Sequence, residues 1–204
     1  MPLFYQHNVN STSKLAVWHI TETEDFFMEK VHLQKTITHP HKRLQHLAGR
    51  YLLQLLDPLF PIDSILISES KKPLLTGETF HFSISHCGDF AAAIISANGI
   101  VGIDVELVTP KIELVKYKFL RESELQLLPA GNTQLLTLLW SCKEAIYKWY
   151  GKGLLSFKEN MIIDQLFIEN EEGIVSARFL NSMEIPLKLH FKFFENLCLV
   201  WVIK

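Results

Sequence analysis

The sequence has few cysteines, almost no net charge and no long apolar run. Its three cysteines, Cys87, Cys142 and Cys198, show no CxxC spacing, which argues against a disulfide framework or a structural zinc site and favours a reducing compartment. Twenty Lys and Arg against 22 Asp and Glu give a net charge of -2, unlike proteins that coat nucleic acid. No apolar stretch approaches the roughly 20 residues of a membrane span, and residues 1–10 do not resemble a secretory signal. We therefore expect a cytoplasmic protein that binds neither nucleic acid nor membrane.

The order of expected elements divides the chain into two similar halves. Residues 1–100 are expected to form strands around one long helix at 41–56. Residues 101–204 are expected to form a strand, helices at 114–128 and 133–150, and an antiparallel sheet. Because each half offers helices and a sheet, we predict an α+β fold of two pseudo-symmetric halves packed together, with the active site at their junction.

A short segment at residues 102–106 alternates apolar and acidic side chains. The period of two in a strand places Asp104 and Glu106 on one face, while Ile103 and Val105 enter a core on the other. Alternating acids are most often a solvated strand face. Two neighbouring carboxylates also repel each other unless a positive charge lies between them, so this pair is a candidate cation site.

A third carboxylate and an ammonium group follow on the helix expected at 133–150. Glu144 and Lys148 are four residues apart and share one helix face, where such a pair is commonly an exposed salt bridge. Together with Asp104 and Glu106, however, Glu144 completes a set of carboxylate oxygens that suits a hard cation such as Mg²⁺. The predicted metal ligands are Asp104, Glu106 and Glu144.

Other polar groups in the first half could bind an anion. Ser85 and His86 end an expected strand before a glycine turn, where hydroxyl, imidazole and backbone N–H groups could hold a phosphate. Lys72 precedes Pro73, and Arg43 and Arg50 lie seven residues apart on one helix face. Each of these features alone is most simply explained as a solvated surface group.

Taken together, these segments resemble the 4'-phosphopantetheinyl transferases, and in particular the longer, surfactin-synthetase-activating type, a monomer with two halves. The family pattern Gly-Ile-Asp-x-Glu is intact at 102–106, and Trp-x-x-Lys-Glu-Ala-x-x-Lys-x-x-Gly-x-Gly-Leu is intact at 140–154. The Lys-Pro and Ser-His elements precede them in the expected order at 72–73 and 85–86. The resemblance spans residues 42–154.

The resemblance implies a magnesium-dependent enzyme that transfers 4'-phosphopantetheine from coenzyme A to a serine hydroxyl of an apo acyl or peptidyl carrier protein, releasing adenosine 3',5'-bisphosphate. It implies that Asp104, Glu106 and Glu144 hold Mg²⁺ against the pyrophosphate of coenzyme A, which Lys148 also binds. Glu144 or a water molecule at the metal would accept the serine proton. The residues that the resemblance implies around the nucleotide are Arg43, Arg50, Lys72, Ser85 and His86.

Two other functions remain open on the same residues. One is a different magnesium enzyme that acts on a nucleotide pyrophosphate, such as a hydrolase, and the other is a non-catalytic homologue that binds a carrier protein. Since carrier proteins are typically acidic around the modified serine, we expect a basic or apolar docking surface. Lys116, Lys118 and Arg121 of the helix expected at 114–128 are candidates for it, although the same pattern suits a solvated amphipathic helix.

Overall fold

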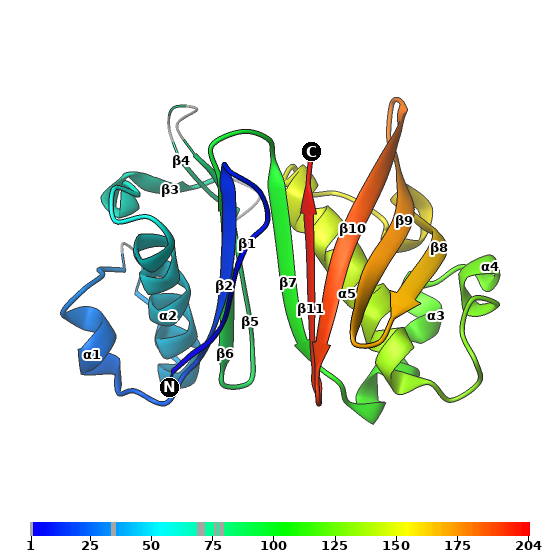
Figure 1. The fold of residues 1–204 in the computed structure, drawn as a ribbon, viewed down its shortest axis with the longest axis horizontal. Helices are drawn as coiled ribbons and strands as arrows, with labels where there is room; N and C mark the ends of the chain where they lie inside the picture. The colour runs from blue at the N-terminus through cyan, green and yellow to red at the C-terminus, as the bar shows by residue number, and fades with distance from the viewer. Residues whose placement is uncertain (1, 34–35, 69–71, 76, 78–79) are drawn as a thin grey trace. The chain divides into compact units, whose positions relative to one another are not determined.

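The structure, a computed structural model, describes residues 2–33, 36–68, 72–75, 77 and 80–204. The chain divides into two compact units, Met1–Val101 (unit 1) and Gly102–Lys204 (unit 2). Each unit combines helices with a sheet (Figure 1), which confirms the predicted α+β class. No helix among the described residues is long and apolar enough to cross a membrane. The location of an active site at the junction of two halves stays a prediction.

The main sheet of unit 1 has four strands in the order β1-β2-β6-β5, and all neighbours pair antiparallel. These strands are Leu3–Asn8 (β1), Ser13–His19 (β2), Phe90–Ser96 (β6) and His81–Cys87 (β5). A separate two-stranded sheet pairs Ile65–Ile67 (β3) with Pro73–Leu75 (β4). The sequence also predicts a strand at 79–85, which the structure shows from His81; Thr79 itself lies outside the described residues. Strands β1 and β4 were not predicted.

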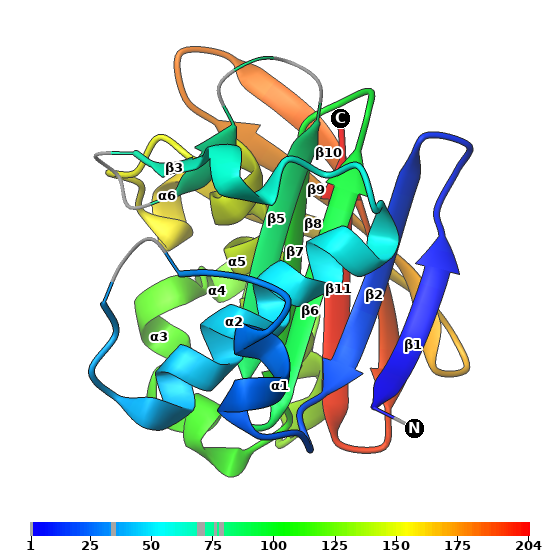
Figure 2. The ribbon, with the colours of Figure 1, turned by 90° about the vertical axis from the view of Figure 1, so that its left-hand side faces the viewer.

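A long helix, α2 (Pro40–Leu56), covers one face of the unit 1 sheet (Figure 2). The helix is predicted from apolar residues three and four positions apart, and this stripe is confirmed, because Leu47, Ala48, Leu52 and Leu53 are buried in one cluster with residues of β2 and β6. Proline at the first turn is compatible with the helix start, and the extended conformation of Asp57 ends the helix. The described residues of unit 1 also form two shorter helices, α1 (Glu24–Met28) and η1 (Ile62–Ser64).

The sheet of unit 2 has five strands in the order β7-β11-β10-β9-β8. These are Val101–Leu107 (β7), which begins at the last residue of unit 1, Leu197–Ile203 (β11), Glu184–Phe194 (β10), Glu172–Leu180 (β9) and Met161–Glu169 (β8). Strands β8 to β11 pair antiparallel in chain order, as the alternating pattern predicted.

Helix α5 (Thr133–Tyr150) packs on this sheet, behind it in the view of Figure 1. Its predicted bounds of 133–150 are confirmed. The Asn132 side chain accepts a hydrogen bond from the Leu135 backbone N–H at 2.9 Å and caps the helix start. Gly151, with φ 71°, ends the helix in the left-handed conformation that favours glycine.

The prediction of one continuous helix at 114–128 is wrong. The structure has three short helices there, η2 (Pro110–Leu114), α3 (Lys116–Phe119) and α4 (Glu122–Leu125). The break follows from extended backbone at Leu120 and Arg121, where the Glu124 carboxylate accepts a hydrogen bond from the Arg121 N–H at 2.8 Å and starts a new helix. A fourth short helix, α6 (Phe157–Asn160), precedes β8.

Candidate functional site

Helix α5 lies directly against the face of β7 that presents Gly102, Asp104 and Glu106. A Cβ atom at Gly102 would overlap the carbonyl oxygen of Ala145 and lie 2.8 Å from the backbone nitrogen of Trp149. Only glycine therefore permits the helix to approach the strand this closely. The two carboxylates consequently face a helix, and the solvated strand face that alternating acids usually indicate is not what forms here.

One stripe of α5, with residues four apart, meets these carboxylates. The Trp140 indole N–H donates to Glu106 Oε1 at 3.2 Å. The Lys148 ammonium donates to Asp104 Oδ1 at 2.7 Å, and the Asp104 side chain is 2% exposed. Glu144 lies between Trp140 and Lys148 in this stripe, so the structure brings the predicted residues of unit 2 to one place.

The protonation of Glu144 reflects its neighbours. Burial, the charge of Asp104 and, to a smaller extent, the charge of Glu106 together raise the pKa of Glu144 to about 7. Only the Lys148 ammonium acts in the opposite direction. The three carboxylates therefore lie close enough to repel one another, and their combined negative charge exceeds what one lysine compensates.

The donor set fits a hard divalent cation in its chemistry, because carboxylate oxygens are the ligands such cations prefer. A cation would also relieve the repulsion that raises the pKa of Glu144. Within the described part of the chain, however, no three His, Cys, Asp or Glu side chains converge as a ready metal-binding group. The metal assignment of Asp104, Glu106 and Glu144 therefore stays a prediction.

The raised pKa of Glu144 predicts how the stability of the protein depends on pH in the absence of divalent cations. Because the folded-state pKa lies above the ordinary value of 4.5, the folded protein binds more protons than the unfolded chain between pH 4.5 and about 7. Stability should therefore fall as the pH rises through this window, and Glu144→Gln should remove this part of the fall. Melting temperatures measured in EDTA across this pH range check the prediction. If the melting temperatures of the wild type and Glu144→Gln change with pH in parallel, the prediction is contradicted.

The predicted residues of unit 1 lie around separate cavities. Arg50 lines a cavity of about 500 Å³ together with Lys42 and His46, also on α2. Burial lowers the pKa of Arg50. The His46 ring lies 5.1 Å from the ring of His86 on β5, so His86 is next to this basic cavity. Sequence reasoning missed His46, although its position four residues before Arg50 places both on one helix face.

Arg43 has a partner within the protein. Its guanidinium forms two hydrogen bonds with the Glu24 carboxylate, one of them 2.9 Å from Nη2 to Oε2, and a third of 2.7 Å with the Ile37 carbonyl. The bond with Glu24 raises the pKa of Arg43. The predicted contact between Arg43 and coenzyme A stays a prediction, and Glu24 would compete with it.

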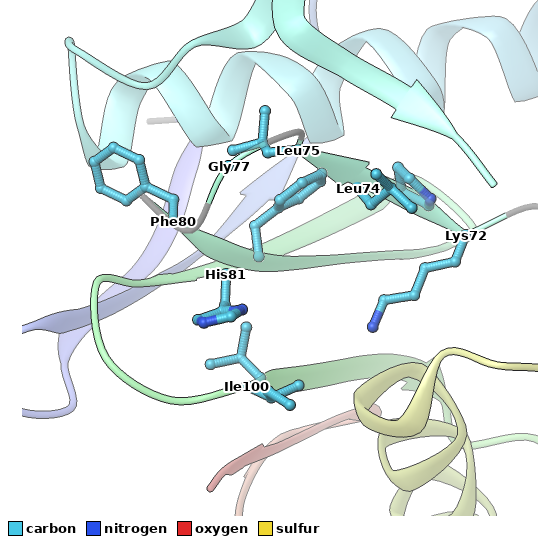
Figure 3. Close-up of a pocket in the computed structure, with 10 residues that line it drawn as sticks. Lys72, Leu74, Leu75, Gly77, Phe80, His81 and Ile100 are labelled. Carbon is cyan, nitrogen blue, oxygen red and sulfur yellow. The ribbon is translucent and has the colours of Figure 1, made fainter.

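Lys72 lines a different cavity of about 240 Å³, together with His81, Phe80 and Ile100 (Figure 3). The Lys72 side chain extends toward the space beside His81 and Ile100. Burial lowers the pKa of Lys72. Ser85 is buried in β5. Arg50 and Lys72, two of the cations predicted near the nucleotide, thus line different cavities, and the Arg50 cavity holds further basic side chains while that of Lys72 is mostly apolar.

A sequence profile of the 4'-phosphopantetheinyl transferase superfamily matches residues 100–199. Over this stretch the chain is similar to members of this superfamily. The matched stretch includes β7 and α5, and with them the cluster of Asp104, Glu106, Glu144 and Lys148. The resemblance that the motifs indicated is therefore confirmed.

Individual relatives match over part of the chain. The 4'-phosphopantetheinyl transferase AcpT of Escherichia coli O157:H7 is 32% identical over 117 residues, which cover 54% of this chain and 59% of the relative. The 4'-phosphopantetheinyl transferase psf-1 of Bacillus pumilus is 36% identical over 80 residues, or 37% and 34% of the two chains. The chain thus spans less than two thirds of the length of these curated relatives.

Proposed function

We propose that this chain transfers 4'-phosphopantetheine from coenzyme A to a serine hydroxyl of an apo acyl or peptidyl carrier protein and releases adenosine 3',5'-bisphosphate. The observation that supports this most is the cluster of Asp104, Glu106, Glu144 and Lys148 on the facing elements β7 and α5, inside the stretch matched to the superfamily. We further propose that it acts as a monomer in the cytoplasm.

Asp104, Glu106 and Glu144 would hold Mg²⁺. The ion, when bound, would neutralise charge on the pyrophosphate oxygens of coenzyme A and polarise the phosphorus that is attacked. Trp140 restrains the Glu106 carboxylate through its indole N–H. Lys148, whose side chain is 24% exposed beside the nearly buried Asp104, can donate to a phosphate oxygen and stabilise the charge on the departing adenosine 3',5'-bisphosphate.

Glu144 is the proposed proton acceptor. The serine oxygen attacks the phosphorus of the phosphopantetheine group, the bond to the other phosphate breaks, and the hydroxyl proton passes to the Glu144 carboxylate. Without a cation the pKa of Glu144 is about 7; a bound cation would lower this pKa and keep the carboxylate ionised, as a proton acceptor near neutral pH requires. No protein nucleophile is needed, since positioning and charge neutralisation supply the catalysis of phosphoryl transfer.

Unit 1 is proposed to supply groups for the nucleotide. His86, with Ser85 beside it, would face the 3'-phosphate and ribose, and His46 and Arg50 in the adjoining basic cavity support this by their position. Lys72 would add positive charge, in a cavity whose apolar walls suit a purine base.

Release of adenosine 3',5'-bisphosphate separates this proposal from its rivals. The chain is incubated with coenzyme A and Mg²⁺, with and without an apo carrier protein, and the nucleotide products are measured by chromatography. A transferase releases adenosine 3',5'-bisphosphate only when the carrier is present. Release without carrier supports the pyrophosphate hydrolase, and carrier binding without release supports the non-catalytic homologue.

Two of the three basic residues proposed for the carrier docking surface have partners within the protein. Lys116 is paired with Glu113 at 2.9 Å, and Arg121 donates to the Lys158 carbonyl at 2.6 Å and to Glu159 at 2.9 Å. Reversing either charge would disturb these internal contacts. Lys118 is exposed and is the better probe.

We expect Lys118→Glu to raise the KM for an acidic carrier roughly two- to fivefold, as one exposed charge interaction of up to about 1 kcal/mol allows, while kcat changes little. The matched control is Lys188→Glu, which makes the same charge change at an exposed position of β10. Steady-state kinetics at low salt measure both. Equal KM values for the two variants contradict docking at Lys118.

A further inference from the structure

Lys143 and Glu124 form an ion pair in the interior of unit 2. The Lys143 Nζ lies 2.7 Å from Glu124 Oε2, and both side chains are 0% exposed. Lys143 also donates to the carbonyl oxygens of Phe119 at 2.8 Å and Phe157 at 3.1 Å. All three N–H bonds of the ammonium therefore have acceptors.

The Glu124 carboxylate also accepts hydrogen bonds from two backbone N–H groups. Its Oε2 accepts a hydrogen bond from the Arg121 N–H at 2.8 Å, and its Oε1 accepts one from the Ile163 N–H at 2.8 Å. The pair therefore joins α5 to the end of α3, the start of α4, the start of α6 and strand β8. These contacts come from segments far apart in the sequence.

Stability alone does not explain such a pair. Moving two charges out of water costs several kcal/mol per ion, and apolar residues of similar volume often stabilise a core equally well. A buried pair with directional bonds to four backbone groups does restrict geometry, because a small shift of one element breaks several short bonds together. The pair therefore fixes one orientation of α5 relative to its neighbours.

The orientation of α5 decides where Glu144 points. Glu144 follows Lys143 directly, so their side chains leave the helix about 100° apart, and a rotation of α5 by about 20° would move a side chain at the helix surface by about 2 Å. Such a movement exceeds the tolerance of about 0.5 Å that a binding site allows. The close contact at Gly102 restrains the distance between α5 and β7.

We infer that the Lys143–Glu124 pair fixes the rotation of α5 and thereby positions Trp140, Glu144 and Lys148 against β7. Lys143 is a positioning residue, since its ammonium is enclosed by protein acceptors and reaches no substrate. The kinetic consequence of this inference rests on the proposed function, whereas its structural consequence does not.

The structural consequence is tested by NMR without substrate. Lys143→Met keeps the length of the side chain but removes the ammonium. The indole N–H resonance of Trp140, which donates to Glu106, should shift in this variant because α5 is no longer held. The control is Val175→Ala, which truncates a fully buried side chain of the same core on β9 and should lower stability without moving this resonance.

The kinetic consequence is the Mg²⁺ dependence of transfer. Loss of a group that orients metal ligands typically costs tenfold or more in metal affinity, so Lys143→Met should raise the Mg²⁺ concentration for half-maximal transfer by about tenfold or more. Val175→Ala, assayed below its melting temperature, should keep the wild-type value. If Lys143 only stabilises the fold, Lys143→Met and Val175→Ala should show the same Mg²⁺ dependence.

The outcomes separate the inference from the proposed function. A folded Lys143→Met with an unmoved Trp140 resonance and an unchanged Mg²⁺ requirement overturns the inference. If Lys143→Met does not fold, Glu124→Gln decides in the same assays, because it keeps the shape of the side chain and loses the charge. A wild-type protein that transfers nothing refutes the proposed function and leaves the NMR test of the inference intact.

Discussion

Replacing Asp104 by Asn is expected to reduce phosphopantetheine transfer by on the order of 10²- to 10³-fold, the usual effect of removing one group that stabilises developing charge. Asn has the same shape, so the contact with α5 survives, but it lacks the negative charge that a cation requires. Glu144→Gln should reduce transfer to a similar extent. Transfer to a carrier protein, measured as kcat/KM, checks both, with circular dichroism to verify the fold.

The matched control for this prediction is Asp164→Asn. Asp164 on β8 also forms a close ion pair, with Arg178 at 2.8 Å, so the control repeats the substitution and the loss of an ion pair elsewhere in unit 2. It should keep near wild-type transfer. Asp104→Asn and Glu144→Gln variants that both transfer at near-normal rates would refute the metal assignment.

The second large effect is expected from Gly102→Ala. A single methyl group would overlap the backbone of α5 at Ala145 and come within 2.8 Å of the Trp149 nitrogen, and backbone atoms cannot yield as a flexible side chain can. The helix must move away from β7, at a cost of about 3 kcal/mol, the upper part of the usual range for overpacking. We expect a lower free energy of unfolding, measured with urea, and loss of most of the transfer activity.

Gly49→Ala on α2 serves as the comparison for Gly102→Ala. A Cβ atom there meets the side chain of Ile84 alone, which can adjust by changing its rotamer. Its stability loss should be clearly smaller than that of Gly102→Ala. If both variants lose equal stability, the backbone contact between α5 and β7 at Gly102 does not cause the larger loss predicted for Gly102→Ala.

Local patterns were enough to predict the elements that hold the unit 2 cluster. The bounds of α5 followed from the break at residues 129–132 and from Gly151, and the structure shows Asn132 capping the helix start and Gly151 ending the helix. Strand β7 followed from strict alternation. Both signals lie within a few residues of the elements they define, so no tertiary information was needed.

Tertiary contacts explain what the sequence did not reveal. Asp104 has the alternation of a solvated acid but is buried, because α5 packs over it at Gly102. The helix expected at 114–128 is broken where Glu124 turns inward to Lys143 and to the Arg121 N–H. Glu124 and Lys143 are 19 residues apart, and their spacing gives no local signal.

The basic groups of unit 1 illustrate the same distinction. The shared helix face of Arg43 and Arg50 was predictable from their spacing, whereas the ion pair of Arg43 with Glu24 was not, because it depends on how α1 packs against α2. Strand β1 was missed for a related reason. Its side chains are mostly exposed and polar, and its pairing with β2 supplies the order that its own sequence does not predict.

The mass of a carrier protein tests the central claim most directly. A panel of apo acyl and peptidyl carrier proteins is incubated with the chain, coenzyme A and Mg²⁺, and intact masses are recorded by mass spectrometry. The account predicts that at least one carrier gains the mass of a single phosphopantetheine group, at its serine, and that EDTA or Asp104→Asn suppresses the gain. Unchanged masses for every carrier in the presence of the folded wild-type protein would contradict the account.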